Sequence, residues 1–173
     1  MIMQFLRTNQ AIMYGATVLR VWLGYLWLIS GIDKIMHGFS AHKFINMAIK
    51  NPVQGLHGEQ FPWFTTFLKI TTANGTQTKL YSCIVPWAEI LVGLGLIIGL
   101  FTLIAAFGGL IMNFVFIFAG TISSNPLFII AEMLILVIGS SASRLGLDYW
   151  VLSWLHRHLL SKSRPYEPYE PHF

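Results

Sequence analysis

Residues 81–122 read YSCIVPWAEILVGLGLIIGLFTLIAAFGGLIMNFVFIFAGTI, and this stretch decides the fold. It stays apolar for roughly twice the 20 or so residues that one membrane-crossing helix needs. The segment Gly99-Leu100-Phe101-Thr102 interrupts it. A connection this short forces the two helices to run antiparallel. We therefore predict two spans, near residues 81–100 and 102–122, joined as a tight hairpin, with Pro86 loosening the first turns of the earlier one.

The rest of the chain has the same apolar character. Of its 173 residues, 55% are hydrophobic and only 10% are charged, whereas soluble domains carry about 25% charged residues. So few charges cannot cover a surface in water. Two further spans are predicted, near residues 13–36 and 126–142, the second beginning at Pro126 after a polar turn. The predicted fold class is an all-α integral membrane four-helix bundle in residues 1–148, multi-pass in the cell membrane.

The long segment between the first two spans contains two short amphipathic patterns. Apolar residues recur at helical spacing in both, as Ala41, Phe44, Ile45 and Ala48 and then as Phe64, Phe67 and Leu68. We predict two short helices on the outer face of the bundle or in the headgroup layer. They would form either a packed surface loop or a cap over a cavity.

A third amphipathic pattern follows the last span. Residues 149–162 carry an apolar stripe with aromatic anchors, which predicts an interfacial helix with Asp148 as its N-cap. The Pro/Tyr/Glu-rich tail, residues 163–173, should be extended and mobile. Lys and Arg are equally numerous on the two sides of the predicted bundle, so they do not decide its orientation. Because the longer, aromatic-rich loop resembles an outer cap, we place both termini in the cytoplasm.

Ionisable residues inside the predicted spans are the first functional candidates. Each costs about 2.5 to 3.5 kcal/mol at the centre of a membrane, so such residues usually face the bundle interior. Depth along the helices, at about 1.5 Å per residue, predicts two polar layers. The outer layer holds Asp33, Lys34, Glu89 and Glu132, and the inner layer holds Arg20, Arg144 and Asp148. Two interpretations are open: internal salt bridges that fix helix register, or an outer layer that binds a ligand and exchanges protons with it.

Other features narrow the functions. Gly95 and Gly99 form a GxxxG pair, which favours internal packing over a homo-oligomer. The single Cys83 cannot form an internal disulfide. The net charge of +4 comes mostly from residues beside the spans, so membrane lipids are expected partners and nucleic acid is not. The loop histidines match no zinc spacing, and no histidine lies within a predicted span, so neither a metal nor a haem is expected.

Five sequence segments together resemble the DoxX/DoxD family of small four-helix membrane proteins. They are RVWLG at 20–24, GIDK at 31–34, PWAEILVGLGL at 86–96, GLFT at 99–102 and GLD at 146–148. The 86–96 segment is the most specific. The resemblance implies a link to membrane redox systems, because DoxD is the large subunit of a thiosulfate:quinone oxidoreductase that works with a small partner subunit.

Two functions follow as hypotheses. In the first, the chain is a subunit of a quinone-linked redox system, in which Lys34 attracts an anionic donor such as thiosulfate and Glu89 acts catalytically by handling protons. In the second, it is a non-enzymatic membrane module that scaffolds a redox partner or binds a lipid or other small hydrophobic molecule. No cofactor motif is present in the chain, and a family fold does not fix a function.

Overall fold

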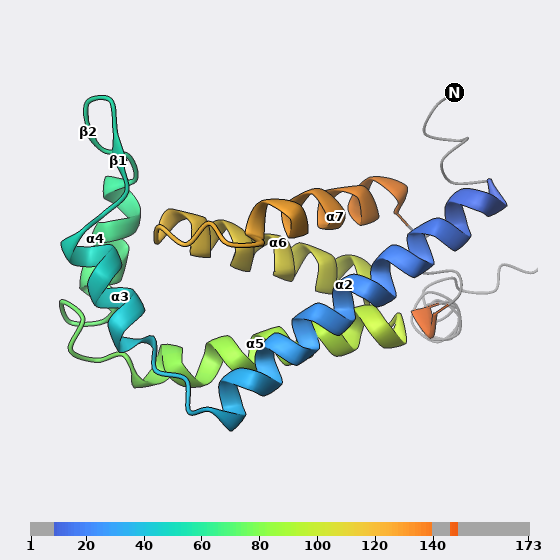
Figure 1. Cartoon of the computed structure of the whole chain (residues 1–173), viewed down its shortest axis with the longest axis horizontal. Coiled ribbons are helices and arrows are strands. Elements are labelled where there is room, and N and C mark those ends of the chain that lie inside the picture. The colour runs from blue at the N-terminus through green and yellow to red at the C-terminus, as the bar shows by residue number, and fades with distance from the viewer. Residues whose placement is uncertain (1–8, 140–145, 149–173) are drawn as a thin grey trace, which may run out of the picture.

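The computed structural model describes residues 9–139 and 146–148, and these residues are mostly helical (Figure 1). The elements are α2 (Gln10–Met36), α3 (Ala41–Lys50), β1 (Gln54–Gly55), β2 (Gly58–Glu59), α4 (Pro62–Thr71), α5 (Lys79–Ile98), α6 (Thr102–Phe118) and α7 (Asn125–Ile138). The two short strands pair antiparallel and were not predicted. The predicted interfacial helix at 149–162 and the tail at 163–173 lie outside the described residues.

The four longer helices alternate in direction (Figure 1). The start of α2, the α5–α6 turn and the end of α7 lie at one end of the molecule. The short helices α3 and α4, the β-hairpin and the α6–α7 turn lie at the other. Within the described residues, α2 and α5 are long and apolar enough to cross a membrane, whereas α6 and α7 are shorter apolar helices.

The helices expose large apolar side chains around the molecule. The exposed fraction is 70% for Val18 on α2, 66% for Leu91 on α5, 68% for Ile104 on α6 and 58% for Ile130 on α7. Water-soluble proteins rarely expose contiguous apolar surface on this scale. Lipid is the solvent that accommodates such a surface.

Glycines bring α2 and α5 into close contact. A Cβ atom at Gly93 would lie 2.5 Å from the backbone nitrogen of Leu28, and one at Gly31 would lie 2.8 Å from the carbonyl oxygen of Pro86. Larger side chains would push the helices apart, as in other membrane helix pairs. Helix α5 continues through Pro86, so the predicted loosening does not interrupt it.

The α5–α6 turn is tight, as predicted. Gly99 ends α5 in the left-handed region at φ 70°, and Gly95 faces Ala105 of α6. Both glycines of the GxxxG pair therefore have contacts within the chain. Phe101 is also left-handed, at φ 51°, which costs a residue with a Cβ of order 1 kcal/mol or more.

Residues 146–148 return to this turn and hold it. The carboxylate of Asp148 accepts hydrogen bonds from the backbone N–H groups of Phe101 and Thr102, the latter at 2.9 Å. The backbone N–H of Asp148 donates to the carbonyl of Gly99 at 2.8 Å. The carboxylate of Asp148 therefore caps the start of α6, where the turn leaves two N–H groups without a helical partner. Its predicted role as the N-cap of a helix at 149–162 concerns residues outside the described part of the chain.

Two buried clusters organise the interior. One lies between the long helices and includes Leu23, Trp27, Leu96 and Ile135. The other joins α3 and α4 to the end of α6 through Ala48, Phe64, Leu68 and Ala119. The two predicted amphipathic helices are thus confirmed, and their apolar faces pack against the end of the bundle.

Candidate functional site

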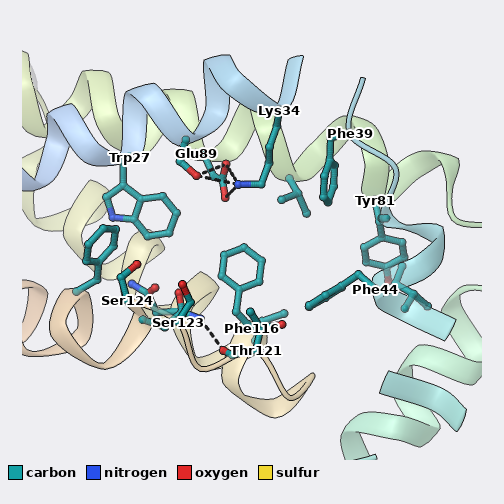
Figure 2. Close-up of a pocket in the computed structure, with 18 of the residues that line it drawn as sticks. Trp27, Lys34, Phe39, Phe44, Tyr81, Glu89, Phe116, Thr121, Ser123 and Ser124 are labelled. Carbon is teal, nitrogen blue, oxygen red and sulfur yellow. Dashed lines mark hydrogen bonds and ion pairs between the residues drawn. The ribbon is translucent and has the colours of Figure 1, made fainter. Parts of the chain in front are cut away.

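A cavity of about 550 Å³ lies between the long helices and the α3–α4 end of the molecule (Figure 2). Its walls come from α2, α3, α4, α5, α6, α7 and the α6–α7 turn. Most of its lining is apolar, with the aromatic side chains Trp27, Phe39, Phe44, Phe64, Phe67, Tyr81, Phe116 and Phe128. Its volume falls within the roughly 300–1,000 Å³ of small-molecule sites.

An ion pair lies on the α2–α5 wall of this cavity. The Nζ atom of Lys34 is 2.9 Å and 2.8 Å from the two carboxylate oxygens of Glu89. Ser30, one turn before Lys34 on α2, accepts a hydrogen bond from Nζ at 2.8 Å and donates to Glu89 at 3.3 Å. In Figure 2 the pair borders the open space. Glu89 is 1% exposed and Lys34 is 25% exposed, so the site has a buried carboxylate and a partly exposed ammonium group.

The opposite wall carries hydroxyl groups. Thr121, Ser123 and Ser124 of the α6–α7 turn lie across the open space from the ion pair, with the ring of Phe116 beside them (Figure 2). All three hydroxyl residues are exposed. The cavity therefore has an ion pair on one wall and hydroxyl groups on the other.

A second polar cluster adjoins the cavity. Glu132 on α7 is fully buried. One of its oxygens accepts from Nε1 of Trp27 at 3.0 Å, and both accept from Nδ2 of Asn113, at 3.0 and 2.9 Å. Trp27 and Asn113 line the cavity, and they connect it to Glu132. Both donors to this carboxylate are neutral.

The predicted outer layer of four residues does not form as one cluster. The side chain of Asp33 is 67% exposed and lies 3.0 Å from Nδ1 of His37. Successive residues on a helix are rotated by about 100°, so Asp33 does not face Glu89 when Lys34 does, although it also lines the cavity. Glu132 lies at the level of Trp27, which is seven residues before Lys34 and so about 10 Å along the helix.

The predicted inner layer is found in part. Arg20 is 2% exposed, and its Nη1 atom is 3.4 Å from the hydroxyl oxygen of Thr102. Asp148 accepts from the backbone N–H of the same Thr102. Arg20 and Asp148 therefore meet at the α5–α6 turn, whereas Arg144 lies outside the described residues.

Three residues of these clusters were not predicted. Ser30 supports the ion pair, and Trp27 and Asn113 hold Glu132. A signal was present for two of them. Ser30 is spaced one helical turn from Lys34, and Asn113 is a single amide in the apolar run LIMNFVF. Trp27 carried no such signal, because aromatic residues are common in membrane helices.

Comparison with known proteins places this fold in one family. A family model described as DoxX matches residues 15–122. We found no match to the chain among curated proteins or solved structures. The matched region includes Lys34, Glu89 and Asn113 and covers more than half of the chain. The chain therefore belongs to the DoxX family of membrane proteins.

Proposed function

We propose that this DoxX-family protein is the membrane subunit of a quinone-linked redox system and that its cavity binds the quinone. One observation carries the proposal: a mostly apolar cavity of about 550 Å³ has the buried Glu89, paired with the partly exposed Lys34, in its wall. Apolar pockets with few, well-placed polar groups are typical of sites for small amphipathic molecules. An unneeded buried charge would be costly, so such charges in membrane helices usually mark function.

The cavity is lined by aromatic rings and by hydrogen-bonding groups, which are the kinds of side chain that could bind a quinone. The aromatic rings of Phe39, Phe44 and Phe116 border the space (Figure 2) and offer faces for a planar ring. The three N–H groups of the Lys34 ammonium contact Ser30 and the two oxygens of Glu89, and one of them would turn to a ring carbonyl when a quinone binds. A bound quinone would supply the chemistry of accepting two electrons and two protons. Glu89, already hydrogen-bonded to Lys34, would hold or release a proton beside that carbonyl.

The electron donor we propose is a small anion such as thiosulfate, or a small partner subunit. Two thiosulfate ions that join through a new S–S bond release two electrons, which balances the reduction of one quinone. Lys34 is the residue that would attract the anion, since it lines the cavity and a quarter of its side chain is exposed.

The alternative is a non-enzymatic module that binds a lipid or scaffolds a redox partner. The exposed Phe67 and the largely apolar walls of the cavity favour this alternative. They would hold an acyl chain as readily as a quinone tail. In that case Lys34 would contact an anionic headgroup.

Extraction of the purified protein with organic solvent tests the two functions. We expect quinone in the wild-type extract, and roughly tenfold less in Glu89→Gln, because a hydrogen bond to a charged group is lost or weakened. The control Lys79→Gln removes an exposed charge at the start of the same helix, α5, away from the residues that line the cavity, and should leave the quinone content unchanged. Phospholipid alone in the wild-type extract would favour the alternative. Equal loss of quinone and thermal stability in Glu89→Gln would assign Glu89 a structural role only.

Adding thiosulfate to the quinone-loaded protein, with any co-purified partner retained, tests the donor. Reduction of the bound quinone, seen by its ultraviolet absorbance, would support a redox subunit. An unchanged spectrum would contradict thiosulfate as the donor.

We further propose that α2, α5, α6 and α7 all cross the membrane, with both termini in the cytoplasm. The alternating directions of these helices support this topology (Figure 1). In a Cys83→Ser background, Ser124→Cys is expected to react with an impermeant maleimide from outside intact cells, and Ala11→Cys only after the membrane is opened. Both parent residues are exposed. Reaction of both cysteines from the same side would contradict the topology.

A further inference from the structure

The amide nitrogen of Asn113 has hydrogen-bond partners, whereas its amide oxygen has none in the described part of the chain. Asn113 is fully buried on α6. Its Nδ2 atom donates to both oxygens of Glu132, whereas its Oδ1 atom is buried with no hydrogen-bond partner among the described residues. More than about 90% of buried polar groups in proteins have a partner. This oxygen therefore requires an explanation.

The orientation of the amide follows from the chemistry of its neighbour. A carboxylate can only accept hydrogen bonds, and Glu132 also accepts from the indole N–H of Trp27. The amino half of Asn113 must therefore face Glu132. The carbonyl half is left on the other branch of the amide, and it can only accept.

The place of Asn113 indicates where its missing donor comes from. Asn113 lines the same cavity as Trp27, Lys34 and Glu89. We propose that Oδ1 of Asn113 accepts a hydrogen bond from a hydroxyl group of the cavity's ligand, so that the site selects a phenolic, reduced molecule over its hydroxyl-free form. This inference rests on the proposed function, because it takes the cavity to be a ligand site.

Two polar groups of the cavity, on Lys34 and Asn113, then recognise opposite properties of the ligand. Lys34 can only donate, and Oδ1 of Asn113 can only accept. A hydroquinone meets both demands, because each of its hydroxyl groups can donate and accept. A quinone meets only the first. A tenfold preference for the hydroquinone would raise the two-electron midpoint potential of the bound couple by about 30 mV, which favours reduction of the quinone at this site.

A pair of probes in which methyl groups replace the two hydroxyl hydrogens tests the inference. The probes are an alkylated hydroquinone and its dimethyl ether with the same alkyl chain, titrated into the full-length protein in nanodiscs. Empty nanodiscs correct for partition into lipid. We expect the hydroquinone to bind roughly tenfold more tightly, since the ether leaves Oδ1 unpaired.

Asn113→Leu should reduce this preference to near one, mainly by weakening hydroquinone binding. The matched control Asn51→Leu changes an exposed amide at the end of α3 and should keep the wild-type preference. If Asn113→Leu does not fold, equal dissociation constants of the two probes for the wild-type protein would still overturn the inference.

The outcomes separate this inference from the proposed function. Equal binding of the two probes by the wild-type protein would overturn the inference alone and would mean that water satisfies Oδ1. A preference that survives in Asn113→Leu would also overturn it. If neither probe binds, the proposed function and the inference fail together.

Discussion

Lys34→Met is expected to destabilise the protein by about 3 kcal/mol, because it leaves the carboxylate of Glu89 buried without its cation. Removal of one partner from a buried ion pair costs about 3 to 5 kcal/mol. The lower end applies because a quarter of the Lys34 side chain is exposed. The double variant Lys34→Met/Glu89→Met should recover most of the loss, since it removes both charges and keeps apolar volume.

Thermal unfolding in detergent measures these differences. Lys50→Met serves as the control, because Lys50 is exposed at the end of α3 and its loss should change the unfolding temperature little. A Lys34→Met protein as stable as this control would mean that water replaces Lys34 beside Glu89. A double variant less stable than Lys34→Met would contradict the explanation that the unpaired carboxylate of Glu89 causes the loss.

Asp148→Ala should cost about 3 kcal/mol and open the α5–α6 turn. Its carboxylate accepts from the N–H groups of Phe101 and Thr102, and each hydrogen bond to a charged group contributes about 1.5 to 3 kcal/mol. The left-handed strain at Phe101 would then lack its main support. Asp148→Asn should lose less, because its amide oxygen can still accept.

Hydrogen exchange measures this effect at the turn itself. The amides of Phe101 and Thr102 should exchange faster in Asp148→Ala, while those in the middle of α5 stay protected. Asp33→Ala removes an exposed carboxylate and is the control. Unchanged exchange at both amides would contradict the assigned role of Asp148.

The hairpin of α5 and α6 was predictable because its causes are local. An apolar run too long for one crossing and a glycine-containing break determine two antiparallel helices. The starts of α6 and α7 agree with prediction, whereas their ends fall four residues early. For α6, the apolar run continues past the end of the helix, so hydropathy does not reveal the turn that begins at Ala119 and Gly120, where Gly120 has φ 88°.

For the polar clusters, the sequence predicted the level of each residue along its helix but not the direction in which its side chain points. Depth placed Lys34 near the level of Glu89, and the structure pairs them. It could not separate Asp33 from Lys34, because these neighbours share a depth and differ in direction around the helix. Asn113 and Trp27 escaped prediction because neither carries a charge, although both donate to a buried carboxylate.

The contact of residues 146–148 with the α5–α6 turn limits how far the protein can be truncated at its C-terminal side. The family match ends at residue 122, so a truncated protein designed from the match alone would end there. A fragment cut there would lack both Glu132 and Asp148, leaving the amide of Asn113 and the N–H groups at the start of α6 without acceptors. The region matched by the family model is therefore shorter than the folding unit. A truncated protein should extend at least through Asp148.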